Sequence, residues 1–224
     1  MTNLWRDWRG FLLFVLVMLV FRSAIADWNQ VPSGSMKPGI LVGDRIVVDK
    51  LAYDLRVPFT QARIATWAGP ARGDVVTFPS PEDERLFVKR VVAVPGDVVE
   101  MRHNQLIING KTALYTPIST ERRATIPLTN KHRYTFYQEE ILGHQRMIMV
   151  RADGAASRHS SFAPISVGPA QYLMLGDNRD DSRDSRWLGL ISRDRIVGRA
   201  HTVAFSLDYD NYYAPRLERF LAPL

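Results

Sequence analysis

Two serines in a loop-forming segment are the first residues whose types suggest chemistry. The segment 31–44 reads VPSGSMKPGILVGD, and it places Ser33 and Ser35 among prolines and glycines that disfavour a regular helix or strand. A serine in such a segment is more often a turn former than a nucleophile, and its hydroxyl attacks efficiently only beside a base. The segment therefore becomes a candidate site only if a base comes close to it.

A lysine within an apolar strand is a candidate for that base. The run 86–94 reads LFVKRVVAV, and alternation places Lys89 on one face with Phe87 and Val91, and Val88 with Arg90 on the other. An isolated lysine of this kind usually extends its amine to solvent. If the amine is buried instead, desolvation lowers its pKa from about 10.4 by several units, and the neutral amine can accept a proton.

A dense polar run, GDNRDDSRDSR at Gly176–Arg186, directly follows another apolar stretch. Such a run is typical of a solvated loop, a cation site or a capped turn. Other chemistries are excluded by inspection, because the chain has no HExxH, GxSxG, GxxxxGK[ST], GxGxxG or SxxK pattern. The absence of cysteine also excludes a disulfide scaffold, a thiol nucleophile and Cys-bearing zinc sites. The sequence implies no metal and no cofactor.

The composition is that of an ordinary globular chain, with 46% hydrophobic and 23% charged residues among 224. The net charge of +6 would suit an anionic partner, yet the basic residues are spread along the chain without a helix-turn-helix or zinc-finger pattern. We therefore expect no nucleic-acid partner, and a membrane surface is the better candidate. The oligomeric state cannot be predicted from these features.

The first 28 residues have a charge, apolar, charge layout. Arg6 and Arg9 precede the uncharged run Phe11–Phe21, and Arg22 follows it. The run is shorter than the roughly 20 apolar residues of a typical span, and Ala24-Ile25-Ala26 also fits a signal-peptide cleavage site. A membrane anchor and a cleavable signal peptide are both compatible with this layout, and either one leaves the amino terminus in the cytoplasm.

The remainder predicts a mostly β fold made of several short twisted antiparallel sheets, behind an N-terminal transmembrane helix. Short β-branched runs predict strands, and MRHNQLIING at 101–110 predicts a hairpin with its turn at His103-Asn104. The spacing of Leu217, Phe220, Leu221 and Leu224 favours a short C-terminal helix packed on its own domain, with an amphipathic tail on the membrane as the alternative. We divide the chain into a cytoplasmic N-terminus (1–9), an anchor (10–26), a first core part (27–110), an insert (111–170), a second core part (171–206) and a tail (207–224). The other expected strands are 44–51, 74–78, 86–94, 97–100, 145–151, 171–175 and 196–205.

Four segments together resemble the conserved motifs of bacterial type I signal peptidases, also called leader peptidases. They are PSGSM at 32–36, RGDVV at 72–76, KRVVAVPGD at 89–97 and GDNRDDSRDSR at 176–186. The resemblance runs from the N-terminal anchor to about Ser206 and fails over the insert, which varies in this family. One departure is Thr77, at a strand position that is commonly apolar in the family.

The resemblance implies a role for particular residues. Ser35 corresponds to the nucleophile and Lys89 to its general base, a Ser–Lys variant of the triad logic. The Ser35 N–H and the Ser33 hydroxyl correspond to the oxyanion hole. The implied lysine-orienting and scaffold residues are Ser182, Asp184, Arg186, Asp177 and Arg179, with Asp184 and Arg186 as an ion pair. The residues implied to line shallow apolar substrate pockets are Val31, Pro32, Met36, Ile40, Phe87 and Val88.

The same resemblance implies a membrane-bound endopeptidase that removes N-terminal signal peptides from exported preproteins after a small-x-small site such as Ala-x-Ala. It favours a retained single-pass anchor in the bacterial inner membrane, with the catalytic domain on the periplasmic side and the lipid bilayer as a partner. Ala24-Ile25-Ala26 remains a hypothetical self-cleavage site. The alternatives are a specialised relative that matures a conjugation pilin and a tethered binding domain without activity, for which Lys89 would keep an ordinary pKa.

Overall fold

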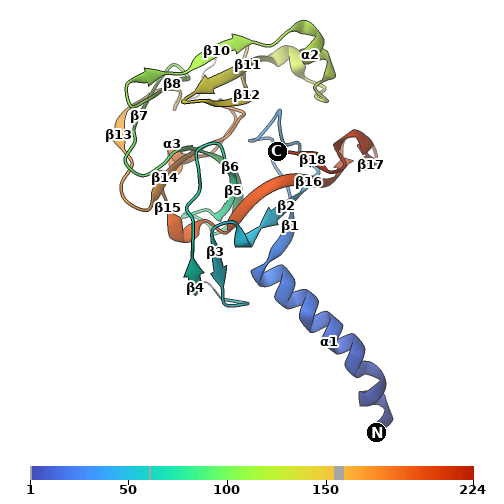
Figure 1. Ribbon diagram of the computed structural model, residues 1–224. Helices are drawn as coiled ribbons and strands as arrows, with labels where there is room; N and C mark the ends of the chain where they lie inside the picture. The colour runs from blue at the N-terminus through green and yellow to red at the C-terminus, as the bar shows by residue number, and fades with distance from the viewer. Residues whose placement is uncertain (1, 61, 154–158) are drawn as a thin grey trace.

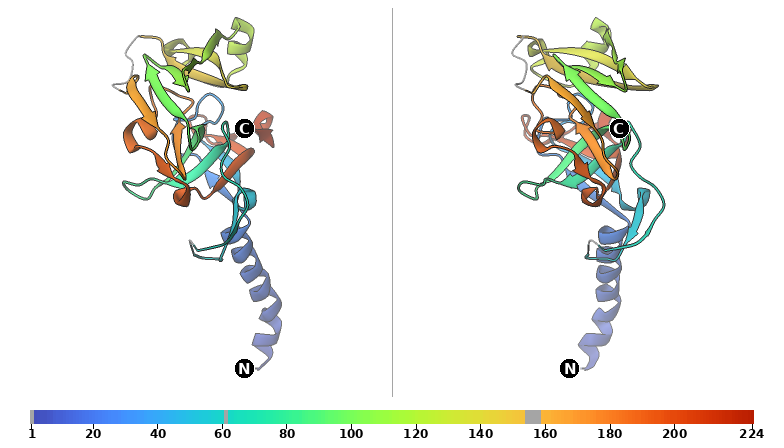
Figure 2. Two further views of the ribbon diagram at one scale, coloured as in Figure 1. Left: turned by 60° about the vertical axis from the view of Figure 1, so that its left-hand side comes forward. Right: turned by 90° about the vertical axis from the view of Figure 1, so that its left-hand side faces the viewer.

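A long N-terminal helix leads into a body built of antiparallel sheets (Figures 1 and 2). The computed structural model describes residues 2–60, 62–153 and 159–224. Helix α1 (Thr2–Ala24) extends away from the body, and β1 (Ala26–Gln30) follows it after one residue. The prediction of a mostly β fold with several antiparallel sheets is therefore confirmed.

The largest sheet interleaves strands from the two ends of the chain. Its order is β1-β2-β16-β5-β6-β14-β15, and β17 and β18 also pair with β16. The long strand β16 lies between β2 and β5, so the C-terminal part of the chain completes a sheet begun by the N-terminal part. Besides β1, its strands are β2 (Asp44–Asp49), β5 (Val75–Pro79), β6 (Leu86–Ala93), β14 (Gln171–Leu175), β15 (Ile191–Ser192), β16 (Gly198–Asp208), β17 (Ala214–Pro215) and β18 (Ala222–Pro223).

Three smaller sheets extend this body, and the sheet β10-β11-β12 lies at the end opposite α1 in Figure 1. The strands of the smaller sheets are β3 (Asp54–Arg56) with β4 (Arg63–Thr66), β13 (Phe162–Ser166) with β7 (Val98–Arg102), β8 (Gln105–Ile108) and β9 (Lys111–Thr112), and β10 (Leu114–Pro117) with β11 (Tyr134–Ile141) and β12 (His144–Arg151). The short helices are α2 (Thr120–Thr125), α3 (Ser185–Leu188), and the 3-10 turns η1 (Lys50–Ala52), η2 (Lys131–Arg133), η3 (Arg193–Arg195) and η4 (Leu217–Arg219).

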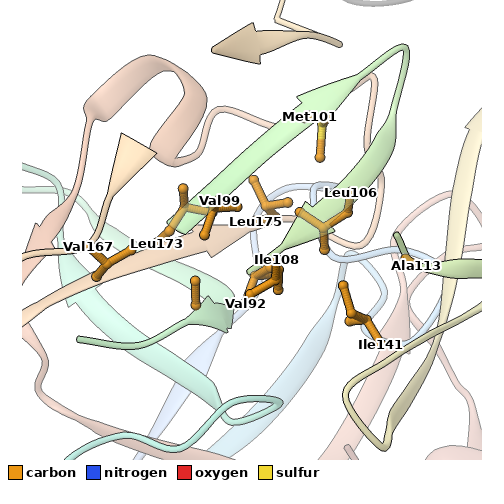
Figure 3. Packing of buried hydrophobic residues seen from close by; sticks show 11 residues of the cluster. Val92, Val99, Met101, Leu106, Ile108, Ala113, Ile141, Val167, Leu173 and Leu175 are labelled. Atoms are coloured by element: carbon orange, nitrogen blue, oxygen red, sulfur yellow. The ribbon is translucent and has the colours of Figure 1, made fainter. Parts of the chain in front are cut away.

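Two apolar clusters hold the sheets together. In the first, the inward faces of β7 and β8 pack on Val92, Leu173 and Leu175 of the main sheet (Figure 3). In the second, Met36 and Ile40 of the segment after β1 pack on the strands beneath them. The strand residues of this second cluster are Ile46, Val48, Val75, Val88, Ala200 and Val203. The loop that carries the two serines is therefore part of the core, although it has no regular structure.

Each of the expected strands is present with bounds shifted by a few residues, and the predicted hairpin turn is confirmed. His103 and Asn104 both have positive φ, at 49° and 63°, as a two-residue type I′ turn requires. Strand β1 was not predicted, because its sequence ADWNQ lacks the β-branched residues that mark a strand. It forms because β2 offers it a five-residue antiparallel register.

The helix expected at the C-terminus is wrong. The segment forms only the 3-10 turn η4 and then β18, which pairs with Thr202 and Val203 of β16. Pro215 and Pro223 bracket the segment, and sheet pairing satisfies backbone groups that so short a helix would leave free. The side chain of Leu224 packs on the same apolar cluster as Met36 and Val31.

Helix α1 contains the whole uncharged run Phe11–Phe21. Within the residues that the structure describes, no helix reaches the combination of length and apolar content that a membrane crossing requires.

Candidate active site

The loop that carries Ser35 is fixed at both ends. Val31 and Asp44 are joined by a backbone hydrogen bond of 2.9 Å, and the Asp44 carboxylate accepts a bond of 2.7 Å from the Leu41 N–H. Asp44 is buried and also pairs with Arg219 at 2.6 Å. With Met36 anchored in the core, these bonds leave the intervening serine little freedom to move.

Lys89 meets Ser35 from the interior of the main sheet. Its Nζ lies 2.7 Å from Ser35 Oγ and donates a second bond of 3.0 Å to the Val88 carbonyl. Lys89 pairs with Val76 of β5, and the next residue, Arg90, pairs with Leu175 of β14, so neighbouring strands hold β6 on both edges. Lys89 is 3% exposed and Ser35 9% exposed, so the pair lies almost entirely out of water.

Burial changes the protonation of Lys89. Desolvation lowers its pKa to about 8, although the carboxylates of Asp184 and Asp177 oppose this shift. At pH 8 about half of the amines are then neutral, whereas an ordinary lysine would be almost fully charged. A neutral amine 2.7 Å from a hydroxyl can take its proton as the hydroxyl oxygen attacks a carbonyl carbon.

The hydroxyl of Ser33 lies beside the same oxygen. Its Oγ is 3.4 Å from Ser35 Oγ, at the limit of a hydrogen bond, and its side chain is exposed to the cleft. Rotation of such a hydroxyl is unhindered enough to reach a substrate oxygen. The role of Ser33 and of the Ser35 N–H as oxyanion donors stays a prediction.

The polar run at 176–186 forms a loop against the serine segment. A Cβ on Gly176 would lie 2.1 Å from Ser182 Oγ and 2.5 Å from the Ser35 carbonyl oxygen, so only glycine fits there. The Gly176 N–H donates to Asp184, whose carboxylate pairs with Arg186 at 2.8 Å. Although burial raises the pKa of Asp184, the Arg186 guanidinium outweighs it and holds that pKa below its usual range.

Asp177 of the same loop binds the strand that carries Lys89. Its carboxylate accepts bonds of 3.0 Å and 2.7 Å from Arg90, the neighbour of Lys89 on β6. The structure thus places Asp177, Asp184 and Arg186 behind the Ser35–Lys89 pair.

Ser182 is buried against Gly176 without touching the lysine amine. Its hydroxyl helps to lower the pKa of the Asp184 carboxyl, whereas the Lys89 amine donates to Ser35 Oγ and to the Val88 carbonyl. An orienting bond from Ser182 to Lys89 remains a prediction.

Asn178 is a site residue that sequence reasoning missed. Its backbone N–H donates to the Ser35 carbonyl and its Nδ2 to the Gly34 carbonyl, both at 3.1 Å. These two bonds join the polar loop to the residues that carry the nucleophile. An asparagine in a polar run usually marks a turn, and no other feature of the sequence distinguishes this one.

The insert also reaches the site, which the sequence did not predict. Glu139 of β11 is fully buried and accepts bonds of 2.6 Å and 2.7 Å from Arg179, which is itself fully buried. Arg146 of β12 pairs with the same carboxylate, and the Tyr115 hydroxyl donates to it at 2.8 Å. Although burial raises the pKa of Glu139, the two arginines lower it to about 2, so the carboxylate is charged at neutral pH.

Backbone pairing strengthens this contact between insert and loop. The Met149 N–H of β12 donates to the Asp177 carbonyl, and the Arg179 N–H donates to the Met149 carbonyl, both at 2.9 Å. The polar loop is therefore held by the nucleophile segment on one side and by the insert on the other.

A cleft of about 630 Å³ opens over Ser35 and Lys89. Five of the residues expected to form substrate pockets line it, namely Val31, Pro32, Met36, Phe87 and Val88. Ile40 does not, because it lies below them in the core at 1% exposure. Tyr134, Asn178, Asp181 and Arg183 line the cleft as well and were not predicted.

Thr77, the departure noted in the sequence, lies beneath this cleft opposite Val88. It is fully buried, and its hydroxyl has no hydrogen-bond partner within the described part of the chain. In the same described part, no three His, Cys, Asp or Glu side chains converge as a metal site would require.

A serine and a partly neutral lysine at an open cleft are the chemical components of a serine hydrolase. Residues 5–205 match the family model described as signal peptidase, peptidase S26. The signal peptidase I of Pseudomonas aeruginosa is 32% identical over 210 residues, covering 88% of this chain and 71% of the relative. That of Aquifex aeolicus is 32% identical over 222 residues, covering 87% and 81%.

A solved signal peptidase I from Enterococcus faecalis V583 is 24% identical with a TM-score of 0.35, covering 60% of this chain and 98% of that one. The family match and the identities place this chain in the signal peptidase family, peptidase S26. By that membership it is a serine endopeptidase that removes signal peptides.

The lowered pKa of Lys89 predicts how activity depends on pH. Because only the neutral amine can accept a proton, kcat/KM should fall about tenfold per pH unit below pH 8 and level off above it. Peptide cleavage measured between pH 6 and 9.5 checks this. A profile that keeps rising tenfold per pH unit up to pH 9.5 would show an amine without the desolvation described.

Asp184→Asn should move the same profile toward lower pH. The Asp184 carboxylate raises the pKa of Lys89 and Arg186 lowers it, so loss of the carboxylate removes the first effect and leaves the second unopposed. We expect the midpoint of the acidic limb to drop, with a lower plateau because the ion pair between Asp184 and Arg186 is lost. An upward shift of the midpoint would contradict the assigned electrostatics.

Glu139→Gln should weaken the polar loop without touching the cleft. Two buried arginines would lose their carboxylate, which typically costs about 3–5 kcal/mol of folding free energy. The free energy of unfolding, measured with denaturant, and kcat should both decrease. Glu140→Gln, on the neighbouring and more exposed residue, should leave both quantities unchanged. Equal behaviour of the two variants would show that the insert does not support the loop.

Proposed function

We propose that Ser35 is the nucleophile of this peptidase and Lys89 its general base. The single observation that carries the proposal is the 2.7 Å contact between Lys89 Nζ and Ser35 Oγ in a site that lowers the lysine pKa to about 8. The residues come from segments 54 positions apart in the chain, so local sequence does not impose the contact. Its geometry suits proton transfer from hydroxyl to amine.

The reaction then proceeds in two steps, acylation of Ser35 and hydrolysis of the resulting ester. Ser35 Oγ bonds to the scissile carbonyl carbon as its proton passes to Lys89, and the carbonyl oxygen becomes an oxyanion. The Ser35 N–H and the Ser33 hydroxyl stabilise that charge. The C–N bond breaks as Lys89 returns the proton to the leaving amine, which leaves an ester on Ser35. Lys89 next deprotonates a water that attacks the ester, and it returns this proton to Ser35.

We propose further that the cleft accepts small side chains one and three positions before the cut, as in Ala-x-Ala. The support is its lining by Val31, Met36 and Val88, whose apolar side chains are at most 8% exposed and fill the space that a larger substrate side chain would need. The segment before Ser35 and strand β6 can hold an extended substrate by β-augmentation. Exported preproteins are the substrates that fit this specificity.

Helix α1 is proposed to anchor the chain in the bacterial inner membrane as a single pass, with the sheets on the periplasmic side. Its uncharged run Phe11–Phe21 presents side chains such as Leu13 and Phe14, each 61% exposed, that lack a protein partner in the described residues. Arg9 and Arg22 flank the run and can extend their charges to the two interfaces. A substrate held in the same bilayer would meet the cleft without free diffusion.

The test is cleavage of a preprotein with an Ala-x-Ala site in detergent micelles, with the cut located by mass spectrometry. Ser35→Ala and Lys89→Ala should each lose at least a thousandfold in kcat/KM, whereas Lys111→Ala, at an exposed lysine of β9, should not. Ser33→Ala should lose about a hundredfold, as expected for one oxyanion donor.

Cleavage by Lys89→Ala at the wild-type rate would show that another residue acts as the general base. A panel of preproteins distinguishes a general signal peptidase from a relative restricted to one pilin, because the restricted enzyme would cut a single member.

A further inference from the structure

Lys37 brings a second amine to the catalytic cleft. It follows Ser35 by two residues, and it lines the cleft together with Ser33 and Lys89. Its backbone N–H donates to the Gly34 carbonyl at 3.1 Å, which closes a turn around the nucleophile. A Cβ on Gly34 would lie 3.1 Å from both Cδ and Cε of Lys37 and 3.5 Å from its Nζ. The lysine side chain therefore folds back over the backbone between the two serines.

The backbone that carries Lys37 is fixed in the core. Met36 before it is fully buried, and Pro38 after it is buried as well. The Met36 carbonyl accepts a bond of 3.0 Å from the Ile40 N–H. The lysine amine is therefore held beside the nucleophile segment, although its side chain is partly exposed to the cleft.

No carboxylate of the protein neutralises Lys37. Its side chain forms neither a hydrogen bond nor an ion pair within the part of the chain that the structure describes. The two arginines that line the same cleft are each paired, Arg85 with Asp83 at 2.8 Å and Arg183 with Glu82. Apart from the catalytic amine, the cleft thus presents one uncompensated cation beside its nucleophile.

Asp181 is the one carboxylate among the described residues that line the cleft, and it is bound to the insert. It accepts a bond of 2.9 Å from the Tyr134 hydroxyl, and the Arg151 guanidinium lies 3.9 Å from it. These contacts offset part of its charge and direct the carboxylate toward the insert. The ammonium of Lys37 therefore remains available to an anionic group of a ligand.

Lys37 also lies where the cleft opens toward the insert. There it lines a smaller cavity of about 80 Å³ with Pro127–Thr129 of the insert and with Asp208 and Asp210, and the residues proposed to receive the signal peptide lie elsewhere. A substrate whose signal peptide fills the apolar pockets continues past the cut on the side away from them. We expect this continuation to pass Lys37 first and the two aspartates later.

We propose that Lys37 is a specificity-determining residue, which binds an acidic side chain within the first three residues after the cut. The inference rests on the proposed function of the cleft, and it extends that function to the mature end of the substrate. Glutamate or aspartate there pairs with the ammonium, whereas lysine or arginine is repelled by it. Because Asp208 and Asp210 follow along the same exit, the preference for an acid is confined to the residues close to the cut.

Cleavage of a peptide series in micelles tests the proposal. The peptides share one Ala-x-Ala site and carry glutamate, glutamine or lysine at the first, second or third residue after the cut. At one or more of these positions we expect kcat/KM to be about fivefold higher with glutamate than with glutamine and about fivefold lower with lysine, as for one partly screened ion pair. Glutamate at the eighth residue should match glutamine there. Salt at about 1 M should reduce the preference.

Variants of the enzyme assign the preference to Lys37. The ratio of kcat/KM for the glutamate and lysine peptides should approach one in Lys37→Gln, invert in Lys37→Glu and persist in Lys37→Arg. Arg85→Gln is the matched control, because it removes a cation that lines the same cleft but is already paired with Asp83. Its ratio should equal that of the wild type. Because each ratio is taken within one variant, a change in folded fraction does not alter it.

The outcomes separate this inference from the proposed function. A wild type that cuts after Ala-x-Ala with a ratio near one would overturn the role of Lys37 and leave the proposed function intact. A ratio that is the same in Lys37→Gln and in the wild type would overturn it too. A wild type that cuts none of the peptides would instead overturn the proposed function.

Discussion

The desolvation of one amine is the constraint on which the site depends. Lys89 can serve Ser35 only while its Nζ stays out of water, and a buried amine is costly unless its hydrogen bonds are met. The interior position of β6 supplies the burial, and the Val88 carbonyl and Ser35 Oγ supply the partners. The position of β16 between β2 and β5 contributes to the same burial, because it completes the sheet beneath the serine loop.

The carboxylates around this amine limit how far its pKa can fall. Asp184 and Asp177 stabilise the protonated lysine, and each is itself held by an arginine, Arg186 and Arg90 respectively. In each ion pair the guanidinium offsets part of the negative charge of the carboxylate. The carboxylates therefore raise the pKa of Lys89 only in part. The balance leaves a base that is neutral in a useful fraction of molecules near neutral pH, and that can still return its proton to a leaving amine.

Sequence reasoning succeeded where a local pattern carries the information. The alternation of LFVKRVVAV predicted the faces of β6, and two residues able to adopt positive φ predicted the turn at His103-Asn104. It failed where a partner distant in sequence decides. Strand β1 forms only because β2 pairs with it, the C-terminal tail follows β16 in place of a helix, and Glu139 gains its role from Arg179, 40 residues away. In the insert, nothing in the local sequence around Glu139 indicated that this carboxylate is buried.

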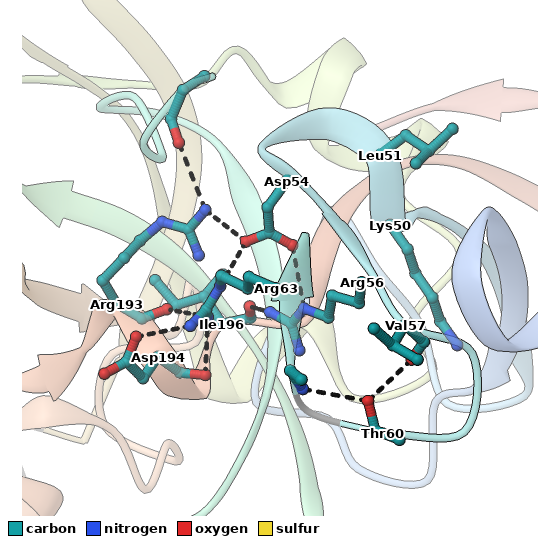
Figure 4. A network of polar contacts seen from close by, with 12 residues as sticks. Lys50, Leu51, Asp54, Arg56, Val57, Thr60, Arg63, Arg193, Asp194 and Ile196 are labelled. Carbon is teal, nitrogen blue, oxygen red and sulfur yellow. Dashed lines mark hydrogen bonds and ion pairs between the residues drawn. The ribbon is translucent and has the colours of Figure 1, made fainter. Parts of the chain in front are cut away.

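The insert and the β3–β4 hairpin are each attached to the rest of the protein by a buried cluster of charged side chains. In each, one carboxylate with almost no exposure collects several arginines, around Glu139 beside the polar loop and around Asp54 beside the helix. Such a cluster packs less efficiently than apolar side chains, but it tolerates only one geometry because every unmet charge is penalised. Directional bonding therefore fixes the orientation of two attachments, that of the polar loop to the insert and that of the β3–β4 hairpin to η3 (Figure 4).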